Sequence, residues 1–250
     1  MNAISRPSSH DLSSGGVALV GAGPGDPELL TLKAVRVIGQ ATLLLVDDLV
    51  SDEILAYAHP DARVVHVGKR GGCKSTPQAF IEKLMIMAAR EGERVVRLKG
   101  GDPFIFGRGG EEKEHLEAAG VSVEVVNGIT SGLAAVTSLG VPLTHRDHAH
   151  GVVFMTGHAQ SGQGVDWPLM ARTAAQARLT LVIYMGISNA AEIQQQLLTG
   201  LPASTPVAIV KHASRPEQRH AVAQLGQLVD TLQREDLSLI HISEPTRLRR

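Results

Sequence analysis

Short apolar runs rich in branched residues alternate along the chain with amphipathic stretches. Continuous runs of Val, Leu and Ile are typical of strands buried on both faces of a sheet. The predicted strands are residues 17–20, 42–46, 63–67, 94–98, 122–126, 152–156, 180–184 and 207–210. Strands that alternate with helices favour an α/β fold with a mostly parallel sheet.

The amphipathic stretches carry helix start and stop signals. Residues 27–40 follow Asp26, a good N-cap, and begin with a proline at the first helical position. Residues 111–119 stop at Gly120, a typical C-terminal glycine. A further helix is predicted over residues 75–91.

Five strand–helix units are complete near residue 128, and the remaining strands follow it. We therefore predict two α/β domains with a cleft between them, because clefts between lobes commonly hold small ligands. The expected organisation is a flexible leader at 1–14, an N-terminal α/β domain at 15–128, a C-terminal α/β domain at 129–236 and an anomalous tail at 237–250.

Composition and charge narrow the classes of function. The 24 Lys and Arg residues balance 25 Asp and Glu residues, which argues against a broad basic surface for nucleic acid. A single cysteine, Cys73, excludes an internal disulfide framework and is typical of a reducing compartment. No apolar run approaches the ~18 residues of a membrane span. We expect a cytoplasmic protein that binds neither nucleic acid nor a membrane.

Three glycine-rich turns follow predicted strands, within the segments at residues 17–30, 97–112 and 125–132. Glycine lets the backbone approach a ligand closely at the start of a helix. Because the carboxyl ends of parallel strands share one edge of a sheet, the three turns predict a single binding edge.

The first turn by itself suggests a Rossmann-type site for NAD or S-adenosylmethionine. Asp47 and Asp48 end the next strand, where such a unit places its ribose-binding acid. Asp26, however, would put a negative charge where a pyrophosphate has to lie. A dinucleotide is therefore disfavoured. NAD-dependent oxidoreduction is an alternative function that only this one turn supports.

Several longer motifs resemble the tetrapyrrole methylases over about residues 15–236. The motifs are GAGPGDPELLTLKA (21–34), VDDLVS (46–51), VGKRGG (67–72), VVRLKGGDPFIFGRGGEE (95–112), GITSGLAA (128–135), GVPLTHRDHA (140–149), FMTGH (154–158) and IYMG (183–186). The resemblance implies the tetrapyrrole methylase fold, which is not that of a Rossmann methyltransferase, with the cofactor between two α/β domains. It also implies a homodimer.

The implied reaction is the methylation of uroporphyrinogen III at C2 and C7, with S-adenosylmethionine as methyl donor and no metal. It gives precorrin-2 through precorrin-1, on the way to sirohaem or cobalamin. By resemblance, the cofactor-binding residues are Pro24, Gly100, Gly101, Asp102, Thr130, Ser131, Met185 and Ala213. Asp102 has a second interpretation, as the cap of the turn that follows it.

A carboxylate near the macrocycle is needed as a base, because a proton must leave after methylation. Asp47 is the candidate, and Lys69 resembles a lysine that handles protons in the family, with propionate binding as its alternative role. Cations must bind the substrate carboxylates, and Arg guanidinium groups match them well. The candidates are Arg70, Lys99, Arg108 and Arg146. For Arg97, within a strand, a structural ion pair is favoured.

Three features depart from a simple assignment. His145, His148, His150 and His158 lie close in sequence, but their spacing is not a zinc pattern. Asn127 stands where the family usually has proline. The tail 237–250 contains Pro245 and three arginines, which could not continue a strand inside a sheet.

Two alternatives to the implied function are considered. They are a methylase of a later corrinoid intermediate and a cofactor-binding module without turnover.

Overall fold

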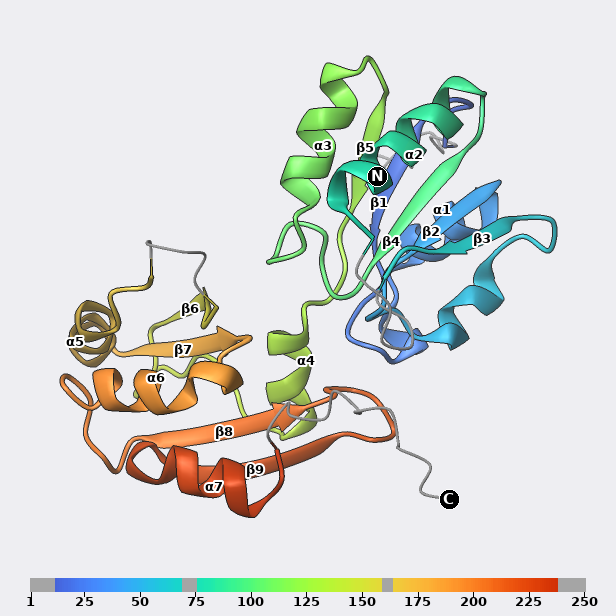
Figure 1. Ribbon diagram of the computed structural model, residues 1–250. Helices are drawn as coiled ribbons and strands as arrows, with labels where there is room; N and C mark the ends of the chain where they lie inside the picture. Colours follow the sequence, from blue (N-terminus) through green and yellow to red (C-terminus); the bar gives the residue numbers. More distant parts are fainter. Residues whose placement is uncertain (1–11, 69–75, 159–163, 238–250) are drawn as a thin grey trace, which may run out of the picture. The chain divides into compact units, whose positions relative to one another are not determined.

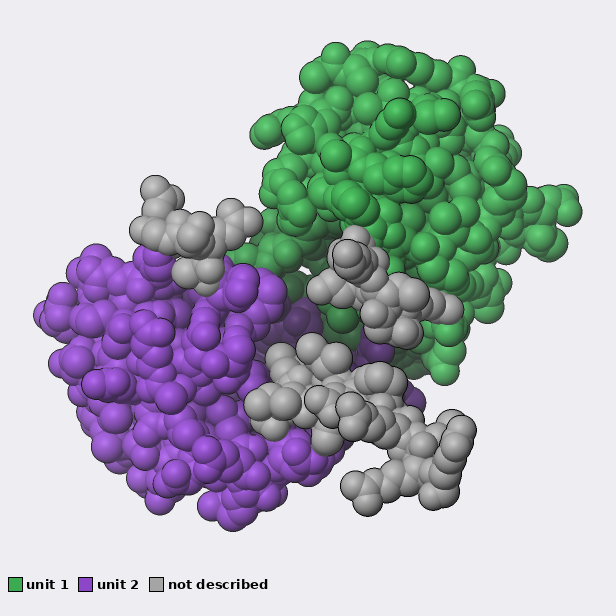
Figure 2. Space-filling view, viewed as in Figure 1, with its two compact units in different colours: residues 1–130 green, residues 131–250 purple. Residues whose placement is uncertain are grey.

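The computed structural model describes residues 12–68, 76–158 and 164–237 of the 250-residue chain. The chain consists of two compact units, residues 1–130 and residues 131–250 (Figure 1). Figure 2 shows unit 1 in green and unit 2 in purple. Lys69, Arg70 and Cys73 lie outside the described residues, as do residues 1–11 of the predicted leader and 238–250 of the predicted tail.

Unit 1 is built on a five-stranded parallel sheet with the strand order β3-β2-β4-β1-β5 (Figure 1). The strands are β1 (Val17–Gly21), β2 (Leu43–Val46), β3 (Arg63–His66), β4 (Val95–Lys99) and β5 (Val123–Val126). Each falls on a strand predicted from the apolar runs. The predicted α/β class with a parallel sheet is therefore confirmed.

Helices cover both faces of this sheet. The helical elements are η1 (Pro27–Leu29), α1 (Leu32–Gln40), η2 (Asp52–Tyr57), α2 (Gln78–Arg90) and α3 (Gly109–Ala118). Side chains alternate along β1, so that Ala18 and Val20 pack with α1 and η2, whereas Val17 and Leu19 pack with α2 and α3. All four are fully buried. This two-sided burial explains why β1 and β2 read as continuous apolar runs.

The helix predicted from residue 27 is wrong at its start. Asp26 caps only the short turn η1, through a hydrogen bond of 2.8 Å from the backbone N of Glu28. The chain is then extended at Leu30, and Thr31 caps α1 by accepting a hydrogen bond from the backbone N of Ala34. A second N-cap residue close to the first therefore divides the predicted helix in two.

Unit 2 holds two small sheets. A parallel pair joins β6 (Gly151–Thr156) to β7 (Leu179–Tyr184), and an antiparallel pair joins β8 (Pro206–Lys211) to β9 (Arg219–Gln224). The helical elements are α4 (Ser131–Ser138), α5 (Trp167–Ala177), η4 (Ile187–Asn189), α6 (Ala190–Leu197), η5 (Leu225–Gln227) and α7 (Leu228–Arg234). Strand β9 was not predicted, because half of its residues are polar and four of the six are exposed.

Two segments at the ends of the described chain pack against their units. Leu12 is buried, and its backbone N donates to Gln40 Oε1 at 3.2 Å. Leu237 is fully buried in a cluster with Ile209 and Leu232. Among the residues that the structure describes, no helix is both long and apolar enough to span a membrane.

Candidate active site

The glycine-rich turns after β1 and β4 are joined through their backbones. The N–H of Gly101 donates to the carbonyl of Gly23 at 2.7 Å, and the N–H of Gly23 donates to the carbonyl of Gly101 at 3.2 Å. Strands β1 and β4 are neighbours at the point where the connections reverse direction, with β2 and β3 on one side and β5 on the other. Open α/β sheets bind ligands at such switch points.

The third turn, after β5, touches the same place. A Cβ atom on Gly21 would lie 2.5 Å from the backbone N of Gly128 and 2.7 Å from the carbonyl oxygen of Gly101. Only glycine fits there, because backbone atoms cannot move aside as a flexible side chain can. The three turns therefore lie together at one edge of the unit 1 sheet.

Asp102 connects two of these turns. Its Oδ1 accepts a hydrogen bond from the backbone N of Phe104 at 2.8 Å, which is the capping role considered from the sequence. Its Oδ2 accepts from the backbone N of Gly128 at 3.1 Å and from Asn127 Nδ2 at 3.3 Å. Asn127 thus supplies a side-chain donor that proline lacks. The buried carboxylate holds the turns after β4 and β5 together.

The other predicted cofactor residues of unit 1 lie in the same turns. Pro24 is half-buried in the first turn, and Thr130 is buried at the end of the third. Gly100 follows β4, and a Cβ atom on it would lie 2.6 Å from Leu49 Cβ. The absence of a side chain at Gly100 therefore lets Leu49 pack directly against the backbone of this turn.

In unit 2, the predicted cofactor residues occupy strained turns. Met185, directly after β7, has a φ of 55° and is 50% exposed, so it is not a core methionine. Ala213 is buried after β8, between His212 and Ser214, whose φ values are 55° and 64°. Left-handed backbone in non-glycine residues is costly and is often retained at functional sites.

Tyr184 was not predicted as a site residue. Its hydroxyl accepts a hydrogen bond of 2.9 Å from the backbone N of Gly132, the residue after Ser131 at the start of α4. A Cβ atom on Gly132 would lie 2.7 Å from Val182 Cγ1, so the ring of Tyr184 and β7 pack directly on the helix. This contact positions Ser131, and the sequence contains no signal for it.

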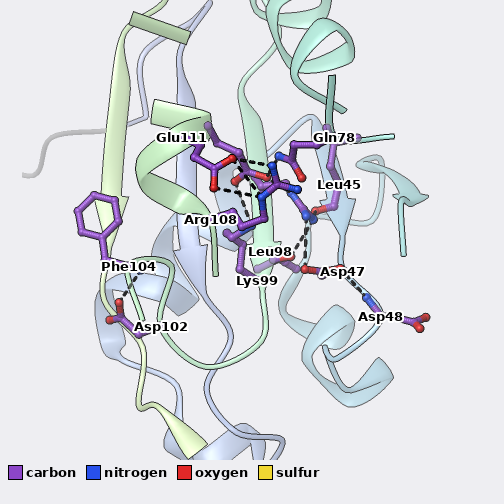
Figure 3. Close-up of polar contacts among 12 residues, drawn as sticks. Leu45, Asp47, Asp48, Gln78, Leu98, Lys99, Asp102, Phe104, Arg108 and Glu111 are labelled. Atoms are coloured by element: carbon purple, nitrogen blue, oxygen red, sulfur yellow. Dashed lines mark hydrogen bonds and ion pairs between the residues drawn. The ribbon is translucent and has the colours of Figure 1, made fainter. Parts of the chain in front are cut away.

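Four charged side chains form a buried ion cluster in unit 1, and Figure 3 labels two of them, Asp47 and Lys99. The cluster consists of Asp47, Arg97, Lys99 and Glu112. Arg97 Nε lies 3.3 Å from Glu112 Oε1, and Lys99 Nζ lies 3.0 Å from Glu112 Oε2. Arg97 also reaches Asp47, with its terminal NH2 group 3.4 Å from Asp47 Oδ2. The structural ion pair predicted for Arg97 is therefore confirmed.

Exposure differs sharply within the buried ion cluster. Glu112, Arg97 and Lys99 have side-chain exposures of 0%, 2% and 3%, whereas Asp47 is 35% exposed at the end of β2. Asp47 Oδ1 also accepts a hydrogen bond of 3.0 Å from the backbone N of Asp48. Asp47 is thus the only member of the cluster in contact with solvent to a large extent.

The structure corrects the interpretation of Lys99 as an available substrate-binding cation. Burial lowers the pKa of the Lys99 ammonium, and the nearby Arg97 lowers it further, while Glu112 opposes both effects. With its ammonium on Glu112 and almost no exposed surface, Lys99 neutralises a carboxylate inside unit 1. It belongs to the support of the sheet edge and not to a basic surface.

Two of the other predicted cations, Arg108 and Arg146, lie within the described residues and are exposed. Arg108 has left-handed backbone just before α3, and its NH2 group contacts Glu111 Oε2 at 2.6 Å. This hydrogen bond raises the pKa of Arg108 and lowers the pKa of the Glu111 carboxyl. Arg146 lies in unit 2, in the tight turn closed by His145 and Ala149.

The same turn of unit 2 lines a hollow of about 440 Å³ that also includes Thr144 and His150. The rings of His145 and His148 are stacked with centroids 4.7 Å apart. In the part of the chain that the structure describes, no group of three or more His, Cys, Asp or Glu side chains could hold a metal ion. These histidines therefore provide an exposed surface with stacked rings.

The sequence analysis also did not identify the apolar side chains that follow β2 and β4 as candidate site residues. Leu49 is 69% exposed after β2, and Phe104, Ile105 and Phe106 are all exposed after β4. Exposed apolar residues that gather beside polar groups are typical of a ligand-binding surface. The signal in the sequence was the Phe-Ile-Phe run inside a glycine-rich turn.

Comparisons with known proteins give a consistent family. A family model described as tetrapyrrole (corrin/porphyrin) methylases matches residues 16–229. A uroporphyrinogen-III C-methyltransferase from Pseudomonas aeruginosa is 53% identical over 217 residues, which are 86% of each chain. A siroheme synthase from Aeromonas hydrophila is 50% identical over 218 residues, 86% of this chain and 46% of the relative. The chain thus spans about half the length of that relative.

Solved structures agree with this. A uroporphyrin-III C-methyltransferase from Thermus thermophilus, complexed with S-adenosyl homocysteine, is 43% identical and superposes with a TM-score of 0.72 over 86% of this chain and 90% of that one. A cobalt precorrin-4 methyltransferase superposes with a TM-score of 0.78 over 89% of this chain and 90% of that one, at 27% identity.

Proposed function

The chain belongs to the tetrapyrrole (corrin/porphyrin) methylases, and we propose that it methylates uroporphyrinogen III at C2 and C7 with S-adenosylmethionine as methyl donor. The product is precorrin-2, formed through precorrin-1. The observation that carries this proposal is the similarity to the Pseudomonas uroporphyrinogen-III C-methyltransferase along most of both chains. In each cycle a macrocycle carbon gains a methyl group, the macrocycle loses a proton from another position, and S-adenosylhomocysteine is released.

The residues of the turns fit such a methyl donor. When bound, S-adenosylmethionine supplies an electrophilic methyl group on a positively charged sulfur. Glycine backbone, the Thr130 and Ser131 hydroxyls and the Asp102 carboxylate offer hydrogen-bond partners without adding bulk. Asp102 uses three acceptor positions on its own turns, which leaves about one of a carboxylate's four for a ligand. Met185 and Ala213 are the proposed residues of unit 2.

Asp47 is the proposed base. Its carboxylate is partly exposed at the end of β2, and Arg97 and the backbone N of Asp48 hold its two oxygens. A carboxylate held in this way is oriented, so it can accept the proton that leaves the macrocycle. Lys69 remains a proposed second proton-handling residue outside the described residues.

Substrate binding is proposed to use both charge and apolar contact. Arg108 and Arg146 are exposed guanidinium groups, and Arg70 is proposed as a third cation. Bidentate contacts from arginine suit the carboxylates of uroporphyrinogen. The exposed side chains of Leu49, Phe104 and Phe106 provide apolar surface for the faces of the macrocycle.

A second candidate is a methylase of a later corrinoid. The superposition on a cobalt precorrin-4 methyltransferase supports it, whereas the much lower identity of that pair disfavours it. We further propose a cytoplasmic homodimer. The siroheme synthases among the relatives support a role of the product in sirohaem synthesis, with cobalamin synthesis as the alternative.

One assay tests the main proposal. The purified chain is incubated anaerobically with uroporphyrinogen III and S-adenosylmethionine, and the products are identified by mass after oxidation. We expect a dimethylated macrocycle and S-adenosylhomocysteine in a ratio of one to two. Binding of S-adenosylhomocysteine without any methylated product would contradict the proposal. Later corrinoids, supplied in a parallel reaction, then distinguish the second candidate from a module without turnover.

A further inference from the structure

Glu112 is an unusual residue for its position. It lies in the first turn of α3, and its side chain is completely buried between β4 and α2. It accepts a hydrogen bond of 2.8 Å from Gln78 Nε2 of α2, in addition to its contacts with Arg97 and Lys99. Burying several charges carries a desolvation cost that apolar residues of similar size would avoid. A stabilising effect on the fold is therefore not a sufficient reason for burying these charges, and the cluster needs another explanation.

Arg97 has a fixed orientation because each of its nitrogens has a partner. Nε contacts Glu112, one terminal NH2 group contacts Asp47, and the other donates to backbone carbonyls of β2 and β4 at 3.4 and 3.2 Å. A planar guanidinium whose three nitrogens all have partners cannot rotate without losing several contacts. The contact with Glu112 at one end therefore determines where the contact with Asp47 lies at the other.

The charges of the buried ion cluster balance. Two cations, Arg97 and Lys99, face two carboxylates, Asp47 and Glu112. Other charged groups surround it: from α2 comes Glu82, paired with His115 of α3, and before α3 lies Arg108, paired with Glu111. Without the charge on Glu112, both buried cations would be left with Asp47 as their carboxylate partner.

We propose that Glu112 is a positioning residue for Asp47, acting through Arg97. Glu112 fixes the guanidinium that orients the Asp47 carboxylate at the sheet edge, and its negative charge keeps Arg97 and Lys99 from being neutralised by Asp47 alone. Asp47 is thereby left available as a proton acceptor. This inference rests on the proposed function, in which Asp47 is the base.

The test compares Glu112→Gln with Glu117→Gln, a control on the same helix that removes an exposed carboxylate paired only with Lys113 in the ion pairs observed. The full chain is labelled with ¹³C at Asp carboxyls, and the Asp47 signal is assigned from its loss in Asp47→Asn. Its titration, the affinity for S-adenosylhomocysteine and the pH profile of kcat are then measured for each protein.

In Glu112→Gln we expect the Asp47 titration to move to lower pH by roughly half a unit or more, because one nearby negative charge is lost. The acidic limb of the kcat profile should move in the same direction. At its plateau kcat should fall roughly tenfold or more, because Asp47 is less well oriented. Affinity for S-adenosylhomocysteine should stay within about twofold, and Glu117→Gln should match the wild-type protein.

Three outcomes decide between the ideas. An unchanged Asp47 titration and kcat in a folded Glu112→Gln protein overturns the positioning role. A shifted titration together with an inactive wild-type protein supports the positioning role and contradicts the proposed function. If Glu112→Gln does not fold, Glu112→Gln combined with Lys99→Met removes one charge of each sign. In that double variant the Asp47 carboxyl should titrate as in the wild-type protein, and kcat should still be reduced. A kcat equal to that of the wild-type protein would overturn the inference.

Discussion

Gly101 donates a backbone hydrogen bond to Gly23, and Gly23 donates one back, across the boundary between the turns that follow β4 and β1. Because Gly128 packs against Gly21 in the same place, the three turns form one unit of backbone. A side chain introduced in this unit affects all three turns and not only its own.

Gly21→Ala should therefore damage both folding and binding. The new methyl group would meet backbone atoms of Gly101 and Gly128, which have no flexible side chain to yield. We expect a loss of about 2 kcal/mol or more in the free energy of unfolding and a marked loss of affinity for S-adenosylhomocysteine. Urea unfolding and calorimetric titration measure the two quantities.

Gly110→Ala is the matched control. Gly110 lies in α3, and a Cβ atom on it would have no neighbour within 4 Å. We expect this variant to be as stable as the wild-type protein or more stable by up to about 1 kcal/mol. Equal damage in the two variants would contradict the argument from close packing of the turns.

Asp47→Asn should separate catalysis from cofactor binding. An amide of the same shape cannot accept the proton, so kcat should fall by roughly 10²–10⁴-fold. Affinity for S-adenosylhomocysteine should change little, because the three glycine turns remain in place. Asp48→Asn removes a neighbouring carboxylate whose own side chain is exposed, and it should retain most of its turnover. A fully active Asp47→Asn enzyme would assign the base elsewhere.

The opposite end of the unit 1 sheet should carry a pH-dependent contribution to stability. Glu93 accepts hydrogen bonds from Thr42 Oγ1 and from Arg63 at 2.7 Å, and the bond from Thr42 lowers the pKa of Glu93 below its ordinary value of 4.5. Stability from a lowered carboxyl pKa is present above the ordinary value and is lost as the pH falls through the lowered one.

At pH 7 we therefore expect Glu93→Gln to be less stable than the wild-type protein, by about 0.5–1.5 kcal/mol. The difference should shrink as the pH is lowered below 4.5. Urea unfolding at a series of pH values tests this, with Glu91→Gln as a control at an exposed position nearby. A difference that is constant with pH would show that Glu93 stabilises through shape and not through its charge.

Tyr184→Phe should weaken cofactor binding through α4. Its hydroxyl accepts the hydrogen bond from the backbone N of Gly132, next to the proposed ligand residue Ser131. We expect a loss of about 1 kcal/mol in stability and a several-fold weaker affinity for S-adenosylhomocysteine. Tyr57→Phe, at an exposed tyrosine of unit 1, should change neither quantity.

The sequence predicted the fold best where a residue type has a single structural consequence, as apolar runs do for strands and glycines do for tight turns. Apolar runs predicted every strand of the unit 1 sheet, including the exposed β3, and glycine after β1, β4 and β5 predicted the common edge. Local caps were less reliable, because Asp26 and Thr31 compete for the start of one helix. Strand β9 has too few apolar residues to be recognised by its pattern.

Pairings between distant residues could not be predicted. Lys99 looks like an available cation in a glycine-rich motif, and only the packing of α3 on β4 brings Glu112 to it. The hydrogen bond between Tyr184 and Gly132 likewise depends on how β7 lies against α4. In both cases the residue type is informative only once its spatial neighbour is known.

The strand order β3-β2-β4-β1-β5 also has a consequence for how the protein is made. Among the described strands, β1 pairs only with β4 and β5, so the first strand of the unit 1 sheet to be synthesised has no partner until residue 95 has been added. Until then only β2 and β3 can pair. The apolar residues of β1 are thus exposed during much of synthesis, when newly made chains are most prone to aggregate. Slow translation before β4 should therefore lower the yield of folded protein.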